Sequence, residues 1–157
     1  MKTYPMTPAG HKSLNDEHER LTKIERPRII EAIATAREFG DLKENAEYHA
    51  AKDEQGQIEA RIRLIEQKLS QCQIIDTSKL ENDGRVIFGT KVTITNLEND
   101  KASEYHIVGE DEADLSLGKI SSSSPIAQGL MGKFEGDIAV IATPDGSCEF
   151  SIDEVIY

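Results

Sequence analysis

The stretch "ENAEYHAAKDEQGQIEARIRLIEQKLSQC" (44–72) contains a regular apolar pattern. Between Ile58 and Cys72 the apolar positions alternate steps of four and three residues, and the register continues backwards to Glu44. The positions in this register are Glu44, Tyr48, Ala51, Gln55, Ile58, Ile62, Ile65, Leu69 and Cys72. Such spacing, sustained over about four heptads, predicts a helix that packs on another helix in a coiled coil. The small and polar residues at its start predict looser packing there.

A second helical stretch precedes it and starts in "MTPAG" (6–10). Thr7 can cap this helix, and Pro8 suits the first helical position, where its missing N–H costs nothing. Helix-favouring residues then continue to Phe39. The apolar positions are Leu14, Leu21, Ile24, Ile29, Ile33 and Ala36. Their stripe shifts phase near Pro27, and a proline removes a helical hydrogen bond, so we expect either a bend there or a break into two helices.

The segment "GDLKENAEYH" (40–49) lies between these two stretches and is expected to form the bend of a helical hairpin. Two helices joined in this way form an antiparallel coiled coil. Because a helix rises 1.5 Å per residue, 30 residues make a projection about 45 Å long. Such a projection has little that could enclose a substrate.

The chain changes character after Lys79, where short β-rich runs alternate with turn signals. The turn signals are "ENDG" (81–84), "NLENDK" (96–101) and "TPDGS" (143–147). In "SSPIAQGLMGK" (123–133), Ser124 can cap and Pro125 can open one short helix, which Gly132 can close. The predicted fold class is therefore α+β, with a coiled-coil hairpin in residues 1–76 and an antiparallel sheet with a short helix in residues 77–157.

The net charge of -11 on 157 residues is unevenly distributed. Residues 1–79 hold 13 basic and 14 acidic side chains, whereas residues 80–157 hold 5 basic and 15 acidic ones. An acidic surface disfavours sequence-independent binding to phosphate backbones. The C-terminal half is therefore expected to dock on a protein rather than on nucleic acid.

The remaining composition favours a cytoplasmic protein without a membrane segment. No run approaches the roughly 18 apolar residues of a membrane span, and the first residues lack the apolar region of a secretory signal. Cys72 and Cys148 fall in different predicted domains and have no metal-binding neighbourhood, so we expect reduced thiols and no structural zinc.

The bend holds the most conspicuous carboxylates, Asp41 and Glu44. One interpretation is a capping box, in which Asp41 caps the second helix and Glu44 occupies its third position, with Gly40 closing the first helix. The other is a pair of exposed oxygen ligands for Mg²⁺, which would leave most of the octahedral shell to other groups. Both can hold at once, because a cap also fixes the carboxylates in place.

Three basic residues, Arg37, Lys43 and Lys52, flank the bend. They can be solvated members of helical ion pairs, or a small positive patch that guides a phosphate backbone. Elsewhere the sequence lacks a complete phosphate-binding loop, a calcium loop and a plausible Cys–His or serine nucleophile. We therefore find no active site that could act alone.

The stretch "EAIATAREFGDLKENAEYHAAKDEQGQIEARI" (31–62) closely resembles the Gre family of bacterial transcript-cleavage factors, and its GreA type most of all. "GRVIFGTKVTITNL" (84–97), "YHIVGEDEAD" (105–114) and "ISSSSPIAQGLMGK" (120–133) resemble the C-terminal domain of that family. The resemblance extends over essentially the whole chain. It implies a coiled-coil N-terminal domain and an FKBP-like C-terminal domain.

The resemblance also implies a function and a partner. Gre factors enter the secondary channel of a backtracked RNA polymerase and stimulate the polymerase's own magnesium-dependent cleavage of the nascent RNA 3′ end. By this likeness, Asp41 and Glu44 would share a Mg²⁺ ion with the polymerase, with no cofactor tightly bound to the factor alone. The factor would be an accessory protein, not an enzyme, and a monomer.

Further roles follow from the same resemblance. Arg37 and Lys52 match a basic patch near the extruded RNA, with Lys52 standing where arginine is common. Lys43 is basic within the tip and is counted with this patch, without a fixed role. The docking segment, which would contact a coiled coil of the largest polymerase subunit at the channel rim, corresponds to Ser121, Ser122, Ser123, Ser124 and Pro125.

Two other functions remain open from the sequence. The chain could bind the polymerase channel as a regulator or chaperone without stimulating cleavage. It could also be a prolyl isomerase, because the C-terminal fold resembles FKBP. Such a site needs an aromatic-lined pocket, and the C-terminal half has few aromatic residues and no tryptophan.

Overall fold

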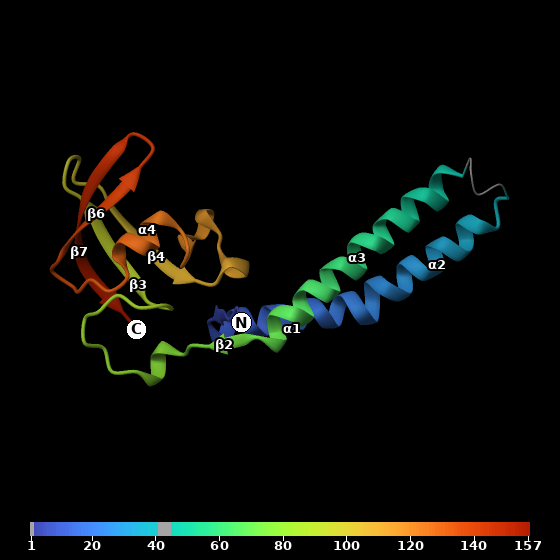
Figure 1. The fold of residues 1–157 in the computed structure, drawn as a ribbon, viewed down its shortest axis with the longest axis horizontal. Helices are drawn as coiled ribbons and strands as arrows, with labels where there is room; N and C mark the ends of the chain where they lie inside the picture. Colours follow the sequence, from blue (N-terminus) through green and yellow to red (C-terminus); the bar gives the residue numbers. More distant parts are fainter. Residues whose placement is uncertain (1, 41–44) are drawn as a thin grey trace. The chain divides into compact units, whose positions relative to one another are not determined.

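The structure is a computed structural model that describes residues 2–40 and 45–157 (Figure 1). The chain divides into two compact units. One comprises Met1–Thr3 and His11–Cys72, and the other comprises Tyr4–Gly10 and Gln73–Tyr157. The first is helical and the second is built on a curled sheet, so the α+β class is confirmed.

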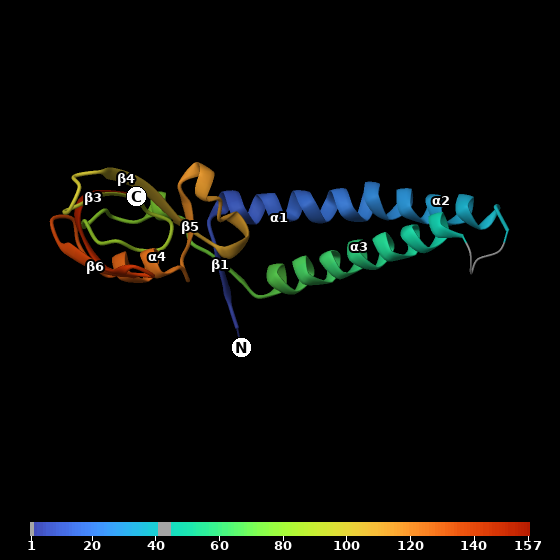
Figure 2. The same cartoon turned by 90° about the horizontal axis from the view of Figure 1, so that it is seen from above.

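The helical unit is a hairpin of two long arms. The first arm consists of α1 (Pro8–Arg20), η1 (Leu21–Glu25) and α2 (Arg26–Arg37), and the second is α3 (Ala46–Ser70). α2 and α3 run side by side in both views (Figures 1 and 2). The second arm is therefore antiparallel to the first, as the sequence predicts.

The phase shift in the first arm has its cause in η1, which is one turn of π-helix. The buried apolar residues of this arm are Leu14, Leu21, Ile29 and Ala36. Their spacing is seven, then eight, then seven residues, so one extra residue must be absorbed after Leu21. The π turn does this, because the N–H of Arg26 bonds to the carbonyl of Leu21, five residues back.

Pro27 lies at the start of α2, where its missing N–H is tolerated. Of the two predicted outcomes, the break into two α-helices is the one observed, but the chain stays helical across it. The assignment of Ile24 to the apolar stripe was wrong. Ile24 lies within the π turn and is 60% exposed, because the wider turn rotates it away from the second arm.

The predicted seam of α3 is largely confirmed. Ala51, Ile58, Ile62 and Ile65 are buried, and Ile65 has no exposed surface. Leu69 is only partly buried. The apolar stripes of the two arms therefore face each other, and their burial is the main stabilising contribution to the hairpin.

Two bidentate ion pairs join the arms on either side of the π turn. Arg61 on α3 donates to both carboxylate oxygens of Glu17, at 2.8 and 2.7 Å. Arg26 donates to both oxygens of Glu59, at 2.7 and 3.0 Å. The hydrogen bonds from Arg61 lower the pKa of Glu17 despite its partial burial, and those from Arg26 lower the pKa of Glu59. Fork-shaped pairs of this kind fix the register of the arms as well as adding attraction.

The second unit is a five-stranded sheet in the order β5-β4-β3-β7-β6. The strands are β3 (Lys91–Asn96), β4 (Ala102–Val108), β5 (Lys119–Ser121), β6 (Ile138–Thr143) and β7 (Gly146–Ile156). The predicted antiparallel sheet is observed except for one pair, because β4 and β5 run parallel. The connection between them carries two short 3-10 turns, η3 (Glu110–Glu112) and η4 (Leu115–Leu117), which bring the chain back beside His106, so that β5 pairs with the last three residues of β4.

One face of this sheet forms the core with α4 (Pro125–Leu130). Val92, Ile94, Ile107, Ile141 and Ile152 from the strands are almost completely buried. Ser124 caps α4 by accepting a hydrogen bond from the N–H of Ala127, as the sequence predicts. The "PDG" turn likewise forms the hairpin between β6 and β7.

The N-terminal segment packs with the second unit. β1 (Tyr4–Met6) pairs with β2 (Cys72–Ile74), and η2 (Thr77–Lys79) follows. Glu112 on η3 accepts hydrogen bonds from the hydroxyl of Thr7, at 2.5 Å, and from its N–H, at 3.3 Å. The Thr7 hydroxyl in turn accepts from the N–H of Gly10, which confirms its predicted role as a cap.

Cys72 and Cys148 are free thiols, as predicted. Within residues 2–40 and 45–157, no helix is long and apolar enough to cross a membrane.

Candidate functional site

The bend of the hairpin is the first candidate site. Asp41, Lys43 and Glu44 lie outside the described residues, whereas both helix ends that carry the bend are described. Within the described part of the chain, no group of three or more His, Cys, Asp or Glu side chains is arranged to hold a metal ion. A metal role for Asp41 and Glu44 therefore stays a prediction.

Asn45 joins the two helix ends. Its side-chain oxygen accepts a hydrogen bond from the N–H of Tyr48 at 3.0 Å, which makes it the N-cap of α3. Its side-chain nitrogen donates to the carbonyl oxygen of Ala36, in the last turn of α2, at 2.6 Å. The predicted capping box was therefore wrong, since the cap is Asn45 rather than Asp41. One amide side chain meets both needs, and a carboxylate could not donate to the carbonyl.

The end of α2 is fixed by its own turn. The N–H of Glu38 donates to the carbonyl of Thr35 and that of Phe39 to the carbonyl of Ala36, both at 3.2 Å. Gly40 then has φ of +105°, a conformation that glycine adopts without strain. The predicted closing role of Gly40 agrees with this geometry.

Two of the three predicted basic residues are described. Arg37 is the last residue of α2, and Lys52 lies on α3; both are exposed. The ammonium of Lys52 is 3.3 Å from the side-chain oxygen of Gln55, one turn along the same helix. The hairpin places these two charges on opposite arms.

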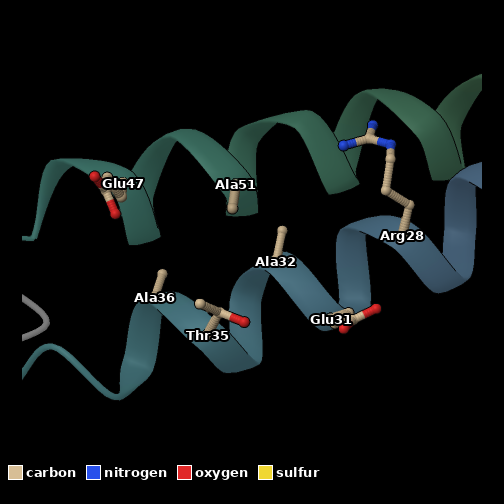
Figure 3. Close-up of a pocket in the computed structure, with 7 residues that line it drawn as sticks. All are labelled: Arg28, Glu31, Ala32, Thr35, Ala36, Glu47 and Ala51. Carbon is tan, nitrogen blue, oxygen red and sulfur yellow. The ribbon is translucent and has the colours of Figure 1, made fainter.

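A groove of about 450 Å³ lies between α2 and α3 below the bend. Ala32 and Ala36 on α2 point toward α3, and Ala51 on α3 points back toward them (Figure 3). Arg28 reaches across at one end of the groove to pair with Glu54. The small side chains leave this space open, as the composition near the bend predicts.

The predicted docking segment forms a compact turn between β5 and α4. The hydroxyls of Ser121 and Ser123 lie 2.8 Å apart, and the N–H of Ser122 donates to the carbonyl of Val108 at 2.9 Å. Ser124 caps α4 and Pro125 opens it, with Pro125 and Ser123 exposed. All five predicted residues therefore lie together on one ordered turn.

An apolar cavity of about 460 Å³ adjoins this turn. Its walls come from segments far apart in the sequence, and they include Leu115, Ile120, Pro125, Ile126, Ala142 and Pro144. Leu115 stands at its edge and is 78% exposed, while Asp114 and Lys119 supply charges to the lining. A cavity of this size and lining can accept an apolar side chain of a partner.

Sequence reasoning missed Asn45 and most of the cavity. Asn45 follows directly after the predicted acidic pair and is a residue type that caps helices, so its identity could have suggested the cap. The cavity had no comparable signal. Leu115, Ile126 and Ala142 are separated along the chain, and they meet only because β4 and β5 are parallel and β6 lies next to α4.

The comparisons with known proteins assign the family. Residues 4–74 match the family model described as "Transcription elongation factor, N-terminal", and residues 81–157 match "Transcription elongation factor, GreA/GreB, C-term". The chain belongs to the GreA/GreB family of transcription elongation factors. The sequence resemblance to the Gre family is thereby confirmed.

Related proteins are similar to this chain in sequence over its full length. The chain is 59% identical to transcription elongation factor GreA of Psychrobacter sp. (strain PRwf-1), covering 100% of this chain and 99% of that protein. It is 59% identical to GreA of Vibrio cholerae with the same coverage, and 55% identical to GreA of Pseudomonas putida over 97% of this chain and 95% of that protein.

Solved structures of related proteins are also similar. GreA factor homolog 1 (Gfh1) of Thermus thermophilus is 26% identical, with a TM-score of 0.44 over 99% of this chain and 100% of that chain. A GreA/GreB factor from Nitrosomonas europaea is 17% identical, with a TM-score of 0.44 over the full length of both chains. The family assignment rests on the sequence matches.

Proposed function

We propose that this chain is an accessory factor that rescues backtracked RNA polymerase by stimulating the polymerase's own cleavage of the nascent RNA 3′ end. The full-length identity of 59% to transcription elongation factor GreA is the observation that carries this proposal.

The hairpin delivers the bend to the polymerase active centre through the secondary channel. Its narrow seam and the ion pairs between its arms make it a projection rather than an enclosure. Arg37 and Lys52 guide the phosphates of the extruded RNA from either arm, and Lys43 adds a third positive charge. Such contacts steer a strand without holding it tightly.

Asp41 and Glu44 are the residues that would hold Mg²⁺, shared with the carboxylates of the polymerase. Carboxylate oxygens suit Mg²⁺, and two of them leave most of an octahedral shell to other groups. An ion held by these residues would supply positive charge to stabilise the negative charge that develops during phosphodiester hydrolysis. The two side chains also accept hydrogen bonds and so orient the attacking water.

The chain docks on the polymerase as a single copy, through its C-terminal unit. The turn 121–125 and the adjoining apolar cavity together offer exposed polar groups beside a hollow for an apolar side chain. A helix of the coiled coil in the largest polymerase subunit fits such a surface. The acidic composition of this half favours a basic or mixed partner surface.

The experiment measures RNA shortening in backtracked complexes assembled with a bacterial RNA polymerase. Wild-type protein is expected to accelerate cleavage at least tenfold over polymerase alone. The isosteric double variant D41N/E44Q should return the rate to that of polymerase alone, while it still displaces labelled wild-type protein from the polymerase. Equal cleavage by the double variant would refute the role of the acidic pair.

The same assay decides between the alternatives. Wild-type protein that binds polymerase but leaves backtracked RNA intact would favour a channel-binding regulator or chaperone without cleavage stimulation. Prolyl isomerase activity is disfavoured, because the residues that line the apolar cavity include no aromatic side chain.

A further inference from the structure

Phe39 is an exposed aromatic residue in the turn that follows α2. The residue is 70% exposed, and among the described large hydrophobic residues only Leu115 is more exposed. A single exposed apolar residue is common on protein surfaces and needs no explanation by itself. Its neighbours and its backbone make this one informative.

The backbone at Phe39 is held in place. Its N–H donates to the carbonyl of Ala36 at 3.2 Å, and the same carbonyl accepts the side-chain amide of Asn45 at 2.6 Å. The residue is therefore carried on an anchored helix end. The backbone that carries the ring therefore loses little further conformational freedom when the ring contacts a ligand.

The chemistry around the ring suits a nucleotide. Arg37, two residues earlier, is exposed and carries a positive charge for a phosphate. Asp41, which the proposed function places at the reacting phosphodiester, is two residues later. Proteins bind single-stranded RNA through aromatic rings that stack on bases and cations that lie near phosphates. Phe39 and Arg37 supply one group of each kind within three residues of the chain.

We propose that Phe39 stacks on a nucleobase of the extruded RNA and so positions the RNA 3′ segment for cleavage. This inference rests on the proposed function. A protein contact would call for a cluster of apolar residues, because interface hot spots lie in contiguous, desolvated patches. In the described ranges 31–40 and 45–54, Phe39 is the one large exposed hydrophobic residue. One ring is enough for one base, since every base has a face that can stack.

The test varies the extruded base and the ring together. Complexes backtracked by one nucleotide are assembled from synthetic RNAs whose 3′ nucleotide carries adenine, uracil or no base. Cleavage rates at saturating and subsaturating factor are then measured for wild-type, Phe39→Leu and Phe39→Tyr proteins. Phe39→Leu keeps an apolar side chain without a ring, and Phe39→Tyr keeps the ring. Thermal unfolding confirms that all three are folded.

Wild type and Phe39→Tyr are expected to cleave the adenine complex about five- to tenfold faster than the abasic one, given the usual strength of base–aromatic stacking. Phe39→Leu should cleave all three complexes at the wild-type abasic rate. Equal slowing of every complex, the abasic one included, would instead indicate a protein contact. No base dependence in wild type, or base dependence retained in Phe39→Leu, would also overturn the proposal. If wild-type protein fails to stimulate any cleavage, the proposed function itself fails, which is a separate result.

Discussion

The side-chain amide of Asn45 donates a hydrogen bond of 2.6 Å to the carbonyl oxygen of Ala36, and its oxygen caps α3 through the N–H of Tyr48. Both helix ends at the bend thus depend on one side chain. Because the donor and the acceptor of the amide serve different helices, their effects can be separated by substitution.

Asn45→Asp is expected to keep the cap and lose the bond to Ala36, because a carboxylate accepts but does not donate. Asn45→Ala should lose both. We expect losses in the free energy of unfolding of about 1 kcal/mol for Asn45→Asp and about 2 kcal/mol for Asn45→Ala. Chemical unfolding, monitored by circular dichroism, measures these losses. Equal stability of Asn45→Ala and wild type would show that the two bonds contribute nothing.

The π turn leads to a prediction about deletions. Removing Ile24 shortens the Leu21–Ile29 spacing from eight residues to seven, so that a regular α-helix keeps both residues on the seam. The deletion is made in a Pro27→Ala background, because proline within that α-helix would cost about 3 kcal/mol. We expect a folded hairpin whose stability lies within about 1 kcal/mol of the Pro27→Ala parent.

Deletion of Ile30 in the same background is the matched control, since Ile30 is similarly exposed at 53%. It shortens the Ile29–Ala36 spacing to six residues and turns Ala36 by about 100° away from α3. A loss of at least about 2 kcal/mol is expected, because this also displaces the Ala36 carbonyl that Asn45 binds. If the two deletion variants were equally stable, the π turn would not be what accommodates the extra residue.

The sequence predicted those features that depend on neighbours along the chain. The seam of α3 followed from spacing alone, and the caps Thr7 and Ser124 followed from residue type and position. The phase shift near Pro27 was visible, but a π turn could not be told from a kink, because both interrupt the same hydrogen bonds.

The features that were missed depend on contacts between distant segments. The sequence does not predict the role of Asn45, because its bond to Ala36 exists only once the arms are paired and because the acidic residues before it also fit a capping pattern. The apolar cavity combines Leu115 and Ala142, which no local pattern relates. The parallel pairing of β4 and β5 was missed for the same reason.

Filling the apolar cavity should weaken docking. Ala142 lines the cavity on β6, so Ala142→Phe would occupy space that a partner side chain needs. We expect affinity for polymerase to fall about tenfold, with the unfolding temperature little changed. Ile138→Phe is the control, because Ile138 is exposed on the same strand outside the cavity lining. Equal affinity of Ala142→Phe and Ile138→Phe, measured by competition with labelled wild-type protein, would exclude the cavity from the docking surface.

The lowered pKa of His106 predicts how the stability of the second unit depends on pH. Burial lowers the pKa of His106, and the positive charges of Lys91 and Lys119 act in the same direction. The hydrogen bond from its ring nitrogen to the carbonyl of Gly89, at 3.0 Å, and the charge of Glu112 oppose this shift without reversing it. The folded protein therefore binds the proton less tightly than the unfolded chain.

The sign of the effect follows from this difference in proton affinity. The contribution of His106 is fully present above the unfolded pKa of about 6.5 and is lost as the pH falls through the lower folded value. Urea unfolding at pH 7.5 and 5.5 should show a larger loss of stability in wild type than in His106→Gln, which keeps a donor for Gly89 but does not titrate. If both proteins lose the same stability between these pH values, other groups account for the dependence.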